Sequence, residues 1–161
     1  MIALTRSCSL AGLVALELLA LPGCRETQRA QYADYHQAEA SGAVQRGWIP
    51  AFVPRSATDI AEVHDLDLNT QRLRFRAAEG DLRARMAALA PMSLEQARGF
   101  DVRTPTLKGA WPPELRAGPL TATPRASVRF FYVPRDSVTH CLAVDSASWT
   151  AFAWNCAKRV I

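Results

Sequence analysis

The sequence predicts an α+β domain: a small antiparallel sheet, made of one hairpin and a three-stranded meander, with helices on one face. Residues 58–77 show a hairpin pattern, residues 79–98 show apolar side chains at helical spacing, and residues 127–154 hold three short β-favouring runs separated by turn residues. Strands grouped at two places, with helices between them, are typical of an α+β architecture.

The first segment is organised like a bacterial secretory signal. Arg6 supplies a positive charge, Leu10–Leu21 an apolar run, and Gly23 a small residue before Cys24. A run of about a dozen residues is shorter than the roughly 20 that cross a bilayer. We therefore predict that residues 1–23 are a signal peptide that is removed on export.

The tetrapeptide Leu21-Pro22-Gly23-Cys24 resembles the lipobox of bacterial lipoproteins, which implies that Cys24 carries a lipid anchor. The alternative is an ordinary signal peptide in which Cys24 has no special role. In terms of that family, Arg25 implies no retention at the inner membrane, so the expected place is the periplasmic face of the outer membrane, or the periplasm. Residues 24–34 are then a lipid-anchored tether and residues 35–161 a single domain.

The composition limits the partners that we expect. The formal net charge is +4, and only Lys108 and Lys158 among the 19 basic residues are lysines. An exported protein does not meet nucleic acid, so no nucleic-acid partner is predicted. The membrane through the lipid anchor, an envelope protein and an anionic cell-surface component are the candidate partners.

Two segments come before the hairpin. Residues 26–46 are rich in Ala, Gln, Glu and Arg, which predicts one helix, or two short helices broken near Ser41-Gly42. Gly47–Pro54 contains two prolines four residues apart, which prevent a regular helix. Its apolar side chains predict a strap over one end of the core, and an exposed aromatic patch for a partner is the alternative.

The hairpin pattern gives a specific register. With Leu66–Thr70 as the loop, Val63 pairs with Leu73 and Ala61 pairs with Phe75, which makes one face apolar. The other face then holds the charged side chains of Glu62, His64, Arg72, Arg74 and Arg76. In this register Glu62 lies opposite Arg74, and the three arginines are solvent-exposed candidates for binding a partner.

The stretch GWIPAFVPRSATDIAEVHDLDLNT carries a family resemblance. It resembles the core of a family of small bacterial exported proteins with a Trp-x-Pro strap followed by a DI-x-E-x-HD-x-D-x-N hairpin. The resemblance covers Tyr35–Arg76 well and the rest of the chain loosely. It implies a shared fold and brings no activity, cofactor or site residue with it.

Two helices and a long loop follow the hairpin. Glu79–Leu89 reads as an amphipathic helix, and Ser93–Arg98 as a second short helix with Ser93 as its cap and Gln96 three residues on. Together they are expected to cover the apolar face of the hairpin. Residues 104–125 form a long proline-containing loop, in which Trp111 is a candidate binding residue. The alternative is that this loop packs along the surface as a second strap.

The C-terminal part predicts strands at Val128–Val133, Val138–Val144 and Thr150–Trp154. Removal of the signal discards Cys8, and lipid occupies Cys24. Two cysteines then remain in an oxidising compartment, so we predict a disulfide between Cys141 and Cys156 across the last hairpin. Two buried free thiols are the alternative.

The most suggestive chemical cluster is His64-Asp65-x-Asp67, since an imidazole and two carboxylates could share a metal or act as an acid–base set. At strand spacing His64 and Asp65 point to opposite faces, and the aspartates suit a turn. We therefore predict no metal site, cofactor or catalytic residue, and a non-enzymatic envelope lipoprotein that acts as a binding or structural module. A metal-dependent or acid–base enzyme that uses His64, Asp65 and Asp67 is the alternative.

Overall fold

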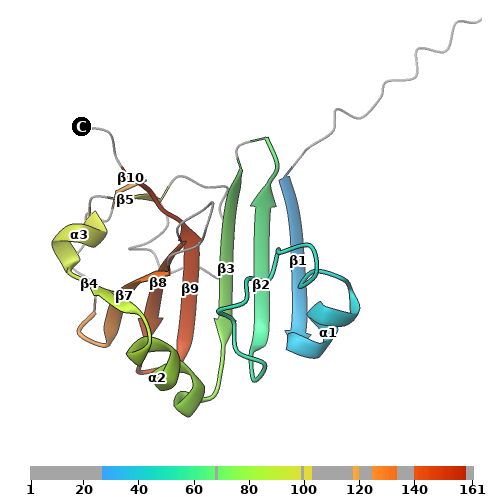
Figure 1. Cartoon of the computed structure of the whole chain (residues 1–161), viewed down its shortest axis with the longest axis horizontal. Helices are drawn as coiled ribbons and strands as arrows, with labels where there is room; N and C mark the ends of the chain where they lie inside the picture. Colours follow the sequence, from blue (N-terminus) through green and yellow to red (C-terminus); the bar gives the residue numbers. More distant parts are fainter. Residues whose placement is uncertain are drawn as a thin grey trace, which may run out of the picture.

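The structure is a computed structural model of the whole chain, and it describes residues 27–67, 69–98, 100–102, 118–119, 125–133 and 140–158. The main sheet consists of the strands β1 (Thr27–Asp34), β2 (Thr58–Asp65), β3 (Thr70–Arg76), β4 (Ala90–Met92), β7 (Val128–Val133), β8 (His140–Asp145) and β9 (Thr150–Asn155). All its pairings are antiparallel, in the order β1-β2-β3-β9-β8-β7-β4 (Figure 1). A small sheet joins β10 (Ala157–Lys158), β5 (Phe100–Val102) and β6 (Gly118–Pro119).

The fold is mostly β, and the predicted α+β class holds only loosely. The helices are α1 (Tyr35–Ala40), α2 (Glu79–Ala87) and α3 (Leu94–Arg98), and of these only α2 is longer than six residues. The helices do not share one face of the sheet. Leu82 of α2 belongs to one buried core cluster and Ala97 of α3 to a second, because the sheet is covered on both faces.

The segment predicted as tether and helix forms the edge strand β1 instead. Thr27 lies opposite Asp65 and Tyr32 opposite Ile60, so β1 extends the hairpin sheet by one strand. Pairing with β2 outweighs the helix-favouring composition of this segment. Asp34 then caps α1 by accepting a hydrogen bond from the Gln37 backbone N–H at 2.8 Å. Gly42 has a φ of +78°, so α1 ends at the predicted break near Ser41-Gly42, but turns rather than a second helix follow it.

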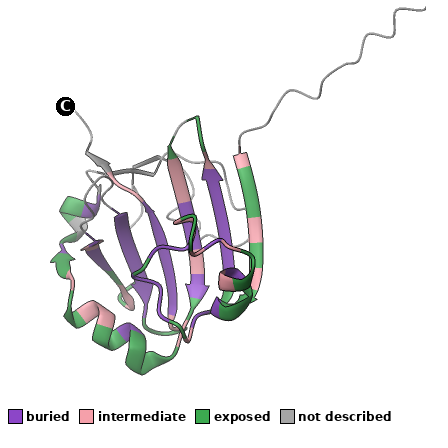
Figure 2. Ribbon diagram, turned by 45° about the vertical axis from the view of Figure 1, so that its right-hand side comes forward, coloured by how far each residue is buried: buried purple, intermediate pink, exposed green. Residues whose placement is uncertain are grey.

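The predicted strap over the core is confirmed. Ile49, Phe52 and Val53 are buried in the first core cluster, together with side chains of the sheet. Trp48 packs against the same cluster and is only partly buried. Figure 2 shows the buried strands at the centre of the sheet and the exposed or half-exposed strand β1 at its edge.

The hairpin exists, but its predicted register is wrong by one residue. Glu62 pairs with Leu73 and Val63 with Arg72, so Glu62 does not lie opposite Arg74. Asp65 pairs with Thr70, which shortens the connection by one residue, and Asn69 adopts a φ of +46° there. The slip moves every side chain of one strand to the other face.

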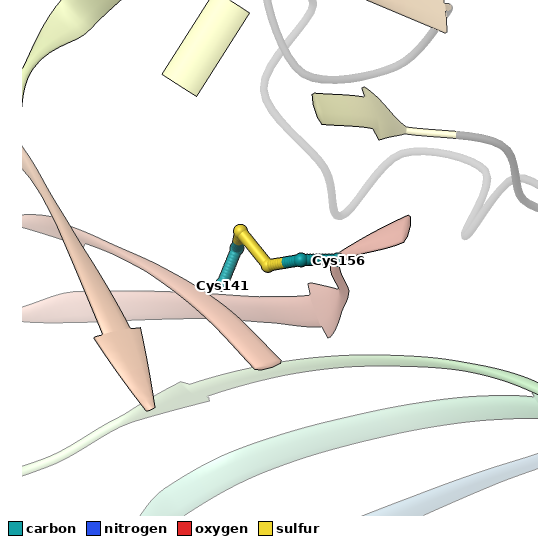
Figure 3. Close-up of a disulfide and its surroundings, with 2 residues drawn as sticks. All are labelled: Cys141 and Cys156. Carbon is teal, nitrogen blue, oxygen red and sulfur yellow. A yellow bond between two sulfur atoms is a disulfide. The ribbon is translucent and has the colours of Figure 1, made fainter. Parts of the chain in front are cut away.

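The C-terminal meander and its disulfide are confirmed. β7 has the predicted bounds, and β8 and β9 each extend one residue beyond their predicted ends. The first two residues of the predicted range of β8 lie outside the described part. Cys141 and Cys156 form a disulfide with their Cα atoms 5.5 Å apart (Figure 3). The predicted cap of α3 is also present, because the Ser93 and Gln96 side chains each accept a hydrogen bond from the other residue's backbone N–H.

Candidate functional site

Polar side chains gather on the strap-covered face of the sheet, at the end where β2 turns into β3. Because side chains alternate along a strand, the residues two positions apart share a face. His64 and Glu62 therefore share a face with Ile60, and Gln71 shares it with Leu73. Further polar members come from the neighbouring strands, namely His140 in β8 and Asn155 in β9.

The centre of this polar cluster is a buried pair. His64 Nδ1 and Glu62 Oε1 are joined by a hydrogen bond of 2.8 Å, and the exposed fractions of these residues are 5% and 0%. Burial raises the pKa of Glu62 to about 8, against a smaller lowering by a hydrogen bond from Gln71. Burial, and then the charge of Arg46, lower the pKa of His64, while Asp65 raises it. The pair is thus neutral at neutral pH.

The strap closes over this pair through Trp48. The Trp48 ring stacks on the His64 ring, with 4.2 Å between their centroids, and the Arg46 guanidinium lies 4.0 Å over the Trp48 ring. Gln71 ties the strap to the sheet, because its Nε2 donates to the Trp48 carbonyl at 2.5 Å. Its Oε1 lies 3.1 Å from His140 Nε2.

A carboxyl with a raised pKa beside an imidazole is a pattern that acid–base enzymes use. Here the pair lies beneath Trp48, so a substrate would have to displace the strap to reach it. The cluster holds the strap through the hydrogen bond from Gln71 to the Trp48 carbonyl and through the stacking of Trp48 on His64. Its geometry is that of an internal polar network that fixes the strap on the sheet.

The residues of the predicted alternative enzyme have different surroundings. His64 is buried in the pair, Asp65 accepts a hydrogen bond from Thr27 at 2.6 Å, and Asp67 is exposed in the turn. In the part of the chain that the structure describes, no group of three or more His, Cys, Asp and Glu side chains could hold a metal ion.

The predicted arginine row is not one exposed face. Arg72 is fully buried, and burial lowers its pKa to about 10, which still leaves it charged at neutral pH. Arg74 pairs with Asp59 at 2.6 Å, and 21% of its side chain is exposed. Arg76 is exposed, as predicted. The other predicted binding residue, Trp111, lies outside the described residues.

The two edges of the main sheet differ. The edge strand β4 has three residues, with a proline at its centre, Pro91. The edge strand β1 has eight residues, no proline and mostly exposed side chains. Short strands and prolines protect an edge from pairing with another chain, so among the described strands β4 is protected and β1 is open. No helix in the described ranges is long and apolar enough to cross a membrane.

Fold and site together define a disulfide-linked, mainly antiparallel β-domain with an internal polar network and one open edge. Residues 26–76 match the family model of the YbbD head domain. The match includes β1, α1, the strap, β2 and β3, and ends where the chain leaves the hairpin. No curated protein and no solved structure matches the chain.

Proposed function

We propose that this chain is a non-enzymatic binding module of the bacterial cell envelope, anchored in the membrane through lipid on Cys24. The signal-like segment and the lipobox-like tetrapeptide before Cys24 support export and anchoring. The disulfide between Cys141 and Cys156 supports an oxidising compartment. In this proposal the chain belongs with small exported proteins that share the strap and the hairpin after it.

The open edge strand β1 carries the proposal of binding. A free edge presents backbone N–H and C=O groups that an extended segment of another protein can pair with, and pockets or flanking side chains then select the segment. The eight residues of β1 are enough for a full added strand. The partner that this edge suits is an envelope protein that contributes an extended segment.

The titratable groups of the site point away from catalysis. The Glu62–His64 pair is covered by Trp48 and has its hydrogen bond inside the domain. The alternative is an enzyme that uses His64, Asp65 and Asp67 with a metal, and the metal content of the purified protein distinguishes it from a binding module. Stoichiometric Zn²⁺ or Mn²⁺ in the purified protein, lost in His64→Ala, would overturn the non-enzymatic proposal.

A charge placed on the edge tests the binding mode. Lysine on an edge strand opposes strand addition, so Gln31→Lys, at an exposed position of β1, should abolish capture of the partner by cross-linking in envelopes. Ala84→Lys adds the same charge at an exposed position of α2 and should leave capture unchanged. Equal capture of the same partner by wild type and Gln31→Lys would contradict the proposal.

A further inference from the structure

The position of Cys24 relative to the sheet sets the orientation of the domain at the membrane, an inference that rests on the proposed lipid anchor. β1 begins at Thr27, three residues after Cys24. Three residues of extended chain span at most about 11 Å. The eight residues of β1 span roughly 26 Å. The lipid on Cys24 can therefore reach the membrane only if the Thr27 end of β1 is close to it.

The Thr27 end of β1 is also the turn end of the hairpin. Thr27 lies opposite Asp65, and its Oγ1 donates to Asp65 Oδ2 at 2.6 Å. Leu66 follows Asp65 directly and begins the turn that leads into β3. In Figure 1 the start of β1 and the turn between β2 and β3 lie at the same end of the sheet. An anchor at Cys24 thus brings this turn to the lipid surface.

The turn between β2 and β3 carries an exposed apolar side chain, Leu66, of the kind that a lipid surface binds. Leu66 is 61% exposed, and it is the exposed large hydrophobic residue within the described ranges. Trp48 lies near the same end, because it stacks on His64, and His64 is two residues before Leu66. The Arg46 guanidinium lies over the Trp48 ring. A leucine that meets the acyl chains, beside an aromatic ring and a cation at headgroup level, is an arrangement found at membrane interfaces.

From this geometry we infer that the end of the sheet with Leu66 rests on the membrane, with the Leu66 side chain in the interfacial layer. The opposite end, with the turn between β8 and β9, then points away from the membrane. Asp67 is exposed beside Leu66, so negative charge accompanies the apolar contact. The contact therefore depends on the anchor and on Leu66 rather than on attraction to anionic lipid.

This orientation leaves the edge of β1 accessible. Gln28, Arg29 and Gln31 are exposed along β1, and none of them offers an apolar surface to lipid. The sheet therefore contacts the membrane with the end that holds the turn between β2 and β3, and not with the edge of β1. The open edge then faces the periplasmic space, where an extended segment of another protein can reach it.

The test places an environment-sensitive fluorophore at either end of the full-length lipoprotein. Asp67→Cys, which leaves Leu66 in place, and Ala147→Cys each introduce one thiol for a nitrobenzoxadiazole label, because Cys141 and Cys156 are joined and Cys24 is occupied by lipid. Ala147 is exposed in the turn between β8 and β9. The labelled proteins are reconstituted on phosphatidylcholine vesicles, and the aqueous reductant dithionite reports which label is accessible. Matching circular dichroism spectra show that both variants are folded.

The expected result is a blue-shifted, dithionite-protected label at position 67 and a fully reduced label at position 147. Equal accessibility of both labels, with acylation of Cys24 confirmed by mass spectrometry, overturns the orientation and leaves the anchor intact. Protection of both labels also overturns it, since the domain would then lie flat. An unmodified Cys24 overturns the anchor and the orientation with it.

Discussion

Glu62 makes the stability of this domain depend on pH in a direction that the structure determines. The pKa of Glu62 rises from its ordinary value of 4.5 to about 8 in the folded protein. Above pH 4.5 the unfolded chain therefore releases a proton that the folded protein keeps until about pH 8. Stability falls as the pH rises through this window, by about 1.4 kcal/mol for each pH unit.

His64 acts in the opposite direction at lower pH. Its folded-state pKa lies below the ordinary value of 6.5, so below pH 6.5 the unfolded chain takes up a proton that the folded protein does not. This term lowers stability as the pH falls. The two terms have opposite signs just below pH 6.5, and the Glu62 term acts alone above that pH. We expect a net loss of about 2 kcal/mol between pH 6.5 and pH 9.

Urea unfolding followed by tryptophan fluorescence measures this loss. Glu62→Gln keeps a hydrogen-bonding group beside His64 Nδ1 and cannot ionise, so its stability should stay nearly constant between about pH 6.5 and 9. Glu79→Gln, which replaces an exposed carboxylate at the start of α2, is the matched control and should retain the loss seen in wild type. An equal loss in wild type and Glu62→Gln would refute the assignment of the slope to Glu62.

Two further predictions concern the sheet. Phe75→Ala should lower the free energy of unfolding in urea by about 3–5 kcal/mol, because it leaves a cavity. Arg72→Ala should lower it several times more than Arg76→Ala does, because Arg72 is buried and Arg76 is exposed. Equal costs at the two arginines would contradict the register seen here. The disulfide closes a loop with a sequence separation of 15, so Cys141→Ala/Cys156→Ala should lose about 3 kcal/mol. Detection of two alkylatable thiols in the unreduced protein would rule the bond out.

Local signals in the sequence predicted the elements whose partners are nearby in the chain. The meander, helix α2, the Ser93–Gln96 cap and the Cys141–Cys156 bond each depend on residues at most 17 positions apart, so turn residues and helical spacing are enough. The hairpin register failed for a different reason. Alternation identifies the buried face only when the other face meets solvent, and β2 is covered on both faces, with Ile60 in one core cluster and Ala61 and Val63 in the other.

The internal polar cluster could not be predicted because its contacts join distant parts of the chain. Gln71 reaches His140, 69 residues away, and the Trp48 carbonyl in the strap. The sequence alone predicts Glu62 and His64 on a charged surface, since full burial of a carboxylate is costly unless it is protonated or paired. The available signal was their spacing from Ile60, which puts all three on one face in steps of two.

The dependence of β1 on a neighbouring strand explains both the incorrect helix prediction for this segment and the proposed binding edge. The residues of β1 favour a helix, and the strand forms because β2 supplies hydrogen-bond partners on one side of it. Among the strands that the structure describes, none pairs with the other side of β1. A strand that depends on pairing rather than on its own preference gains further from a second neighbour. An extended partner on the open side should therefore bind and also protect the β1 amides from hydrogen exchange, and Gln31→Lys should remove both effects.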